Sequence, residues 1–320
     1  MKPDLVLYRG YANENHLVVF GHVSESSAAD KYRLDRKGMN HALSIVRMFD
    51  IRPINNADLR LRFRSLDVRT RTLKDGYFRF DIPFYEHLES GWHTYSVTCR
   101  FNGTEITEQG ELLKPFTSKL GIISDIDDTF LVSHTSNIFR KLYVLLNRNA
   151  ERRKVFEDVA DHYRLLSLAG QEGNAFNSFF YVSSSEWNLY PLINQVTERE
   201  RLPKAVMKLR DIKTGLGDFL FTGGSDHNHK FYKIKDILSF YTDIKYVLLG
   251  DDTQHDPVIY EKICKIFPGS ILAVYIRQSG ENKRKKVQQI LNNMEVLNVA
   301  TCYFRHSEEA IAHSKAIGII

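Results

Sequence analysis

Long apolar segments are missing from this chain of 320 residues. No run approaches the roughly 20 consecutive apolar residues that a membrane-spanning helix needs. The first residues, Met1-Lys2-Pro3-Asp4, lack the apolar centre of a secretory signal peptide. We therefore expect a cytoplasmic protein that has no transmembrane segment and whose contact with a membrane, where it has one, is peripheral. Its hydrophobic (43%) and charged (26%) fractions are those of an ordinary globular protein.

Cysteine is also scarce, and its three positions, Cys99, Cys264 and Cys302, lie far apart in the sequence. Each is surrounded by apolar or strand-like neighbours, so we expect buried, reduced thiols. An odd number of widely separated cysteines argues against both a disulfide framework and a thiolate metal site.

The spacing of a zinc site is missing too. No His-x-x-x-His pair with a glutamate occurs on a predicted helix; the histidines considered are His134, His162, His227, His229 and His255. The net charge of +5 is modest. It permits attraction to anionic surfaces without requiring it, and we expect no nucleic-acid partner.

The N-terminal part, residues 1–116, is rich in β-branched and aromatic residues separated by turn formers. This pattern predicts a small antiparallel sandwich, with strands at 17–23, 59–64, 76–82 and 92–99. A short amphipathic helix is expected over 40–50. The proline of the segment 111–115 marks a plausible end of this domain.

An arginine-rich face is expected within this domain. Arg60, Arg62 and Arg64 alternate along one predicted strand and therefore share a face. Further basic residues follow at Arg69, Arg71 and Lys74. Two interpretations remain open: a solvated outer face of an antiparallel sheet, or an anion-binding surface for a lipid headgroup or a phosphorylated partner.

Residues 117–320 read differently, because strands and helices alternate there. This order predicts a parallel sheet with helices on both faces, the doubly wound α/β class. Ligands of such sheets bind beyond the carboxyl ends of the strands. We expect strands at 120–125, 179–183, 204–209, 245–250, 270–276 and 300–304, and helices at 137–148, 151–168, 230–241, 256–266, 283–297 and 307–316.

The first of these strands leads into an acidic cluster. In an extended backbone Asp125, Asp127 and Thr129 point to one side. Two carboxylates this close repel each other unless a cation lies between them. Mg²⁺ fits, because it prefers oxygen ligands and leaves positions for phosphate and water. Taken alone, the cluster could equally be a surface turn.

Three more motifs follow in order: the strand and hydroxyls of 179–185, the pair His229-Lys230 before a helix, and the strand and aspartates of 246–256. Together with the first motif they resemble the haloacid dehalogenase superfamily of phosphotransferases. The resemblance implies the haloacid-dehalogenase-like form of the doubly wound parallel sheet.

The resemblance also implies roles for five residues. Asp125 would be the nucleophile that forms an aspartyl-phosphate, and Asp127 the general acid and base. Ser183 would hold a phosphoryl oxygen and Lys230 would add a positive charge. Asp251 would complete a Mg²⁺ site with the Asp125 carboxylate and the Asp127 backbone carbonyl.

Several residues close in sequence to these five could share their roles or take them over. Without the other motifs, Ser183 could equally cap the next helix and Lys230 could be a solvated helix lysine. The neighbours that could share or replace the assigned roles are Thr129, Ser184, Lys233, Lys235, Asp252 and Asp256.

Six segments narrow the resemblance: 124–129, 181–191, 209–211, 229–230, 250–260 and 274–277. They resemble the catalytic-domain family of the fungal actin-patch phosphatidate phosphatase and its bacterial relatives, over roughly residues 118–280. The resemblance implies Mg²⁺-dependent hydrolysis of phosphatidate to diacylglycerol. Phe130 and Asp252-Thr253 depart from the expected pattern without removing a catalytic group. A soluble or protein-borne phosphate monoester as substrate and a non-catalytic binding scaffold remain alternatives, and the oligomeric state stays open.

Overall fold

A computed structural model describes residues 2–25, 52–116, 119–126, 150–210, 228–253, 255–278 and 284–320. The helices expected over 40–50 and 137–148 lie outside these ranges. The chain divides into two compact units. Unit 1 is Met1–Pro115 with Glu186–Ile193 and Asp211–Gly223, and unit 2 is Phe116–Ser185 with Asn194–Arg210 and Gly224–Ile320. The domain boundary expected at 116/117 remains a prediction that lies next to this division.

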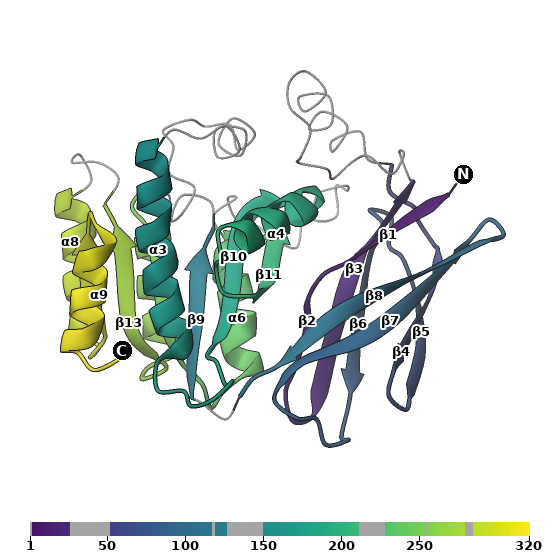
Figure 1. Cartoon of the computed structure of the whole chain (residues 1–320), viewed down its shortest axis with the longest axis horizontal. Coiled ribbons are helices and arrows are strands. Elements are labelled where there is room, and N and C mark those ends of the chain that lie inside the picture. Colours follow the sequence, from purple (N-terminus) through teal and green to yellow (C-terminus); the bar gives the residue numbers. More distant parts are fainter. Residues whose placement is uncertain are drawn as a thin grey trace. The chain divides into compact units, whose positions relative to one another are not determined.

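Unit 1 contains the strands of the N-terminal part (Figure 1). Their bounds are β1 Pro3–Leu7, β2 Gly10–Ala12, β3 His16–Glu25, β4 Asp58–Phe63, β5 Leu66–Arg71, β6 Tyr77–Pro83, β7 Gly91–Phe101 and β8 Thr104–Lys114. They are connected in the order β1-β3-β2-β8-β7-β4-β5, with β6 on the other edge of β3. β2 is parallel to β8 and links β3 to the β8-β7-β4-β5 group.

One hydrophobic core lies within these strands. It joins Leu17 and Val19 of β3 and Phe80 of β6 to Leu61 of β4 and Val97 of β7. Strands from both ends of the hydrogen-bonded path therefore pack on a common core. A sandwich requires this packing, although the sandwich itself remains a prediction.

The strand β4 shows how the sequence sets this core and where the prediction for it was wrong. Leu59, Leu61 and Phe63 are buried on one side, as the period of two requires. However, β4 ends at Phe63, and Arg64 lies in the two-residue turn to β5 with a φ of 49°. Tight hairpin turns need such positive φ values. Arg64 therefore does not share the strand face of Arg60 and donates a hydrogen bond to the His87 carbonyl instead.

An aromatic cluster attaches the segment 186–193 within unit 1. The ring of Trp187 stacks on His22 with centroids 3.7 Å apart and an angle of 6°. The ring of Tyr190 lies 4.5 Å from that of Tyr8, and its hydroxyl accepts a hydrogen bond from the Arg9 N–H at 3.0 Å. The Tyr8 hydroxyl is in turn hydrogen-bonded to Nδ1 of His22 at 2.7 Å.

Unit 2 is built on a six-stranded sheet in the order β11-β10-β9-β12-β13-β14. Pairing is parallel between β10 and β9, β9 and β12, β12 and β13, and β13 and β14. The strand bounds are β9 Leu120–Asp125, β10 Ser178–Glu186, β11 Ala205–Arg210, β12 Lys245–Asp251, β13 Ile271–Arg277 and β14 Ala300–Phe304. The expected α/β class is confirmed, and all six strands were expected to within a few residues.

The helices that follow β9 in the chain, among the described residues, are α3 Ala150–Leu168, α4 Tyr190–Arg199, α6 Asn228–Phe240, α7 Asp256–Ile266, α8 Arg284–Glu295 and α9 Ser307–Ala316, with the 3₁₀ turn η1 at Trp187–Leu189. The sequence analysis missed α4. Within the described ranges, no helix is long and apolar enough to cross a membrane.

The direction of winding changes between β9 and β12. From β9 the chain moves outward to β10 and β11, then returns to β12 and moves outward on the other side to β13 and β14. Because parallel crossovers are right-handed, helices that follow opposite directions cover opposite faces. Figure 1 shows α3 and α9 together on one side of the sheet, and these two helices contact each other. Ligands of such sheets bind where the order reverses, which is at the carboxyl ends of β9 and β12.

We predict that acid weakens unit 1 through His22. Burial lowers the pKa of His22 from 6.5 to about 3. The unfolded chain therefore binds a proton at mildly acidic pH that the folded unit excludes, so stability is complete above the unfolded pKa and falls as pH decreases. From about pH 7 to about pH 5 we expect a loss of roughly 2 kcal/mol.

Urea unfolding followed by tryptophan fluorescence measures this loss, since Trp92 and Trp187 both belong to unit 1. His22→Phe should reduce the pH dependence, whatever its own stability. The exposed His87→Phe serves as the control and should retain the dependence of the unmodified chain. The same pH dependence in all three proteins would contradict the prediction.

Candidate active site

Three aspartates meet at the carboxyl ends of β9 and β12. Asp125 ends β9, Asp251 ends β12, and Asp256 begins α7 directly afterwards. Their exposed fractions are 1%, 0% and 0%. One carboxylate oxygen from each lies within 4.8 Å of the others, close enough to hold one metal ion. The parallel register explains the meeting, because Leu249 pairs with Ser124, so that β9 and β12 end within one residue of the same level, at Asp125 and Asp251.

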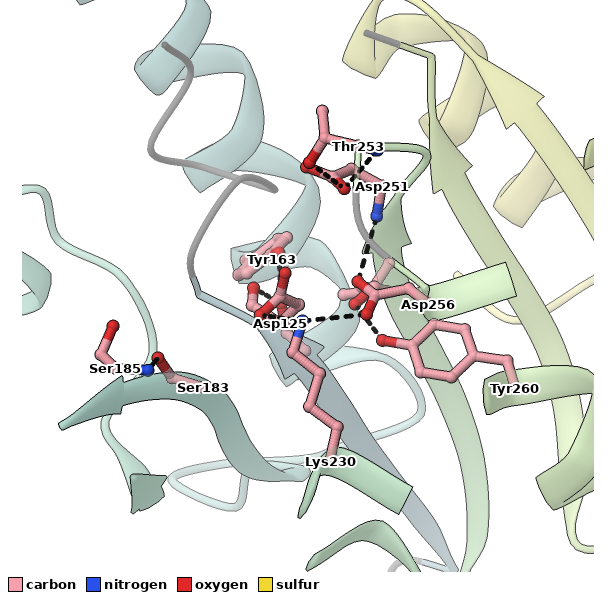
Figure 2. A network of polar contacts seen from close by, with 11 residues as sticks. Asp125, Tyr163, Ser183, Ser185, Lys230, Asp251, Thr253, Asp256 and Tyr260 are labelled. Carbon is pink, nitrogen blue, oxygen red and sulfur yellow. Dashed lines mark hydrogen bonds and ion pairs between the residues drawn. The ribbon is translucent and has the colours of Figure 1, made fainter. Parts of the chain in front are cut away.

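Lys230 neutralises part of this cluster. Its Nζ lies 2.9 Å from Oδ1 of Asp125 and 2.9 Å from Oδ1 of Asp256 (Figure 2). The side chain is buried, with 4% of its surface exposed. It comes from the first turn of α6, which carries the lysine into the pocket from a segment far away in sequence. A buried ion pair of this kind is stable only when both partners are present.

Negative charge exceeds positive charge among these four groups. Three carboxylates face the single ammonium of Lys230, and the effect reaches two buried tyrosines. Burial raises the pKa of the Tyr260 hydroxyl far above its usual value, and the negative charges of Asp256 and Asp125 raise it further. Burial likewise raises the pKa of Tyr163, although its hydrogen bond to Ser124 opposes the rise. The excess of negative charge is what a divalent cation would offset.

Two neighbours of Asp251 shape this end of β12. Thr253 donates two hydrogen bonds to Oδ1 of Asp251, from its N–H at 2.9 Å and from its hydroxyl at 2.8 Å. On the other side, a Cβ at Gly250 would lie only 2.7 Å from Oδ2 of Asp256. Glycine at this position therefore allows the close approach of Asp256. The sequence analysis treated Thr253 only as a departure from the expected pattern and did not assign it a role.

Two tyrosine hydroxyls connect the helices α3 and α7 to the strands β9 and β12. The hydroxyls of Tyr163 in α3 and Ser124 lie 2.5 Å apart, directly beside Asp125. The Tyr260 hydroxyl donates to the Leu249 carbonyl at 2.8 Å, which ties α7 to β12. Tyr260 lies four residues after Asp256, on the same side of α7. This spacing of four residues is a signal in the sequence from which the role of Tyr260 could have been predicted.

The hydroxyl motif lies on the neighbouring strand β10. Val182 pairs with Asp125, so Ser183 follows one residue beyond the level of the aspartate. Ser183 is buried, and its hydroxyl oxygen accepts the N–H of Ser185 at 2.9 Å. Ser184 is half-buried. Figure 2 shows Ser183 and Ser185 on a separate strand from the group around Asp125.

The structure distinguishes between Asp252 and Asp256, the two aspartates that the sequence left open as further members of the site. Asp256 joins the cluster, whereas the carboxylate of Asp252 accepts a hydrogen bond from the Tyr303 hydroxyl at 2.7 Å. Asp127 and Thr129 lie outside the described residues. Their predicted roles are therefore not tested by the geometry.

A divalent cation fits the donor set on its chemistry. The three candidate ligands are hard carboxylate oxygens, the type that Mg²⁺ prefers, and they carry two negative charges more than Lys230 balances. What the geometry establishes is a buried acidic cluster with one lysine at the switch point of a parallel α/β sheet, a site typical of an enzyme domain.

The family follows from comparison with known proteins. Residues 120–278 match the family described as "Phosphatidate phosphatase APP1, catalytic domain", and through them the chain belongs to that family. Phosphatidate phosphatase APP1 of Saccharomyces cerevisiae is 31% identical over 165 residues, which are 49% of this chain and 26% of the relative. An uncharacterized protein of Schizosaccharomyces pombe is 25% identical over 214 residues, 63% of this chain and 33% of the relative. The chain thus spans a third or less of the length of these two relatives.

Among solved structures, a carbohydrate acetylesterase from Xanthomonas citri covers 99% of this chain and 75% of its own, with 9% identity and a TM-score of 0.36. A likeness at this level carries no argument about fold or function.

We predict that Mg²⁺ stabilises the protein through this cluster. At a free Mg²⁺ concentration about a hundredfold above Kd, the free energy of unfolding should increase by roughly 2 to 3 kcal/mol. Thermal unfolding measures this gain as a higher Tm. Asp251→Asn should abolish this gain. Without metal the same variant should be at least as stable as the unmodified chain, because it removes one of three mutually repelling charges.

The control is Asp236→Asn, which neutralises an exposed aspartate of α6 and should retain the full response. If all three proteins gain equally, or if the unmodified chain gains nothing, the cluster is not a Mg²⁺ site.

Proposed function

We propose that this protein is a Mg²⁺-dependent phosphatase that hydrolyses a phosphate monoester through an aspartyl-phosphate intermediate. The observation that carries the proposal is the meeting of Asp125, Asp251, Asp256 and Lys230 inside a domain of the APP1 catalytic family. In this proposal the fold is the haloacid-dehalogenase-like form of the doubly wound sheet. The resemblance of the four motifs supports that assignment.

In the first half of the proposed reaction, an oxygen of Asp125 attacks phosphorus while the bond from phosphorus to the leaving alcohol breaks. The alcohol oxygen takes a proton from Asp127. Lys230, 2.9 Å from Asp125, holds the nucleophile in place and adds positive charge where negative charge develops. The Ser183 hydroxyl, on the next strand, would bind a phosphoryl oxygen.

In the second half, water attacks the phosphorus of the aspartyl-phosphate and passes a proton to the Asp127 carboxylate. The bond from phosphorus to Asp125 breaks, which releases inorganic phosphate and restores both aspartates to their starting states. Covalent catalysis thus replaces one difficult displacement with two easier ones, in which Asp125 is the nucleophile of the first and the leaving group of the second.

The metal would be held by Asp125 and Asp251, with the Asp127 backbone carbonyl as the family resemblance implies. Asp256 lies close enough to the other two carboxylates to be a further ligand. When bound, Mg²⁺ would supply charge neutralisation for the phosphoryl oxygens. The contact between Lys230 and Asp256 then positions the lysine, because the two acceptors hold its ammonium from both sides.

Phosphatidate is the substrate that we propose, with diacylglycerol as the product. The name of the family and that of the S. cerevisiae relative support it. Such a substrate stays in its bilayer, so the enzyme would act as a cytoplasmic protein bound peripherally to a membrane. A substrate panel that includes phosphatidate in mixed micelles and soluble phosphate monoesters distinguishes this proposal from the alternative of a soluble or protein-borne substrate.

We predict that Asp125→Asn abolishes turnover, since an amide does not act as the phosphoryl acceptor. Asp127→Asn keeps its backbone carbonyl but loses proton transfer, so turnover should fall by roughly 10²–10⁴. Hydrolysis of an aryl phosphate at saturating Mg²⁺ measures both effects. Unchanged turnover in either variant would overturn the role assigned to that residue, and absence of turnover in the unmodified chain would favour a binding scaffold.

We also predict that Lys230→Ala reduces turnover strongly, by roughly 10²-fold or more, because it removes a fixed charge from a buried site. Lys235→Ala, on the exposed side of the same helix, should leave turnover close to normal. The comparison holds helix composition and charge change constant. If both variants lose turnover equally, the loss comes from a change in the helix α6, and the role assigned to Lys230 in the site is wrong.

A further inference from the structure

The outer face of unit 1 carries a hollow that the proposed catalysis does not use. It has a volume of about 280 Å³ and is lined by Arg60 and Arg62 of β4, Arg69 and Arg71 of β5, and Arg100 of β7. The sequence analysis anticipated only part of this set and included Arg64, which the turn after β4 removes from it. All five arginines come from three strands that are neighbours in the sheet (Figure 1).

The strand register explains why these side chains gather. Arg60 lies directly opposite Arg69, and Asp58 lies directly opposite both Arg71 on one side and Arg100 on the other. Residues that are directly opposite in neighbouring strands point to the same face. Two like charges in this position destabilise a sheet, so the pair of Arg60 and Arg69 needs compensation from another charge.

The acidic residues around the hollow compensate three of the five arginines closely. Arg60 forms a two-pronged ion pair with Asp67, which raises the pKa of the guanidinium and lowers that of the carboxyl. Arg71 lies 2.8 Å from Asp58. Arg100 pairs with Glu105.

The other two arginines are less well compensated. Arg62 only reaches Asp67, the partner of Arg60, at 3.8 Å. Arg69 forms no ion pair with a described residue. Five guanidinium groups therefore face three carboxylates, which leaves two excess positive charges on a concave surface.

We propose that this hollow binds a phosphate group, at a site separate from the aspartate cluster. The planar fork of arginine matches phosphate oxygens with paired hydrogen bonds. The volume far exceeds the roughly 30 Å³ that one water molecule occupies in the liquid, so a tetrahedral anion fits. Side chains of Arg62, Arg71 and Arg100 are 59%, 63% and 65% exposed, so the ligand can approach from solvent.

The phosphate group can belong to a lipid headgroup or to a soluble molecule, and both have the same chemistry at the arginines. In the first case the face would hold the protein against an anionic membrane. In the second it would bind a free phosphate compound. Since the groups are exposed, the binding should weaken as ionic strength increases.

The test uses the full chain and two probes that involve no turnover. The first probe is a vesicle of equimolar phosphatidylcholine and phosphatidylglycerol, whose phosphodiester is not a phosphate monoester. The second is inorganic phosphate, followed by the NMR signals of the arginine Nε–H groups. Arg62→Glu with Arg69→Glu reverses the two least compensated charges and replaces no residue of the core or of the three close ion pairs.

The matched control is Lys2→Glu with Lys74→Glu, which makes the same change in net charge at exposed positions outside the hollow. We expect the arginine double variant to bind vesicles about thirtyfold more weakly than the unmodified chain, and the lysine double variant to bind nearly as well as the unmodified chain. Hydrolysis of a soluble aryl phosphate should be unchanged in both.

Loss of vesicle binding with no response to inorganic phosphate assigns the site to lipid headgroups. A response of the arginine signals to inorganic phosphate alone assigns it to soluble phosphates. If neither probe binds, or if both double variants lose binding equally, the hollow is a solvated outer face and the proposal is wrong. That result would leave the proposed phosphatase activity untouched, because neither probe depends on turnover.

Discussion

Three buried carboxylates, two of which share one lysine, are the constraint on which the second unit depends. Removing charges from water costs several kcal/mol per ion unless partners compensate them. Here Asp125 and Asp256 share the ammonium of Lys230, and Asp251 is oriented by Thr253. The arrangement needs β9, β12, α6 and α7 to be in their places at once. The site and the fold of this unit are therefore parts of one electrostatic arrangement.

The charged groups of the aspartate cluster in unit 2 are buried, whereas those of the arginine hollow in unit 1 are exposed. This difference suits the function proposed for each site. In unit 2 the charges are buried, so each interaction is strong and little screened by salt. In unit 1 the arginines lie on an exposed face, where each ion pair contributes little to stability but the summed charge can attract an anion. A buried site is suited to chemistry on one phosphate group, and an exposed one to reversible contact.

Most of the second unit could be predicted because its strands are continuous apolar runs with charged or hydroxyl residues at their ends, and buried parallel strands have this pattern. The helix α4 was missed, although its buried residues Leu192, Ile193 and Val196 have helical spacing. In the first unit the strands β1, β2, β5 and β8 were missed. In β5 the arginines and the aspartate leave few apolar residues to reveal a strand.

The sequence by itself determined the order of the motifs, the strand ends that carry Asp125 and Asp251, and the lysine that matches them, whereas Ser183, expected at a strand end, lies inside β10, which continues to Glu186. Local pattern suffices for these, because a side-chain period and a strand end are properties of neighbouring residues. Only the tertiary structure decided that Asp256 and not Asp252 joins the cluster, and that Arg100 and not Arg64 joins the hollow. The first choice depends on the position of α7 beside β12. The second depends on the register between β4 and β7 and on the turn after β4.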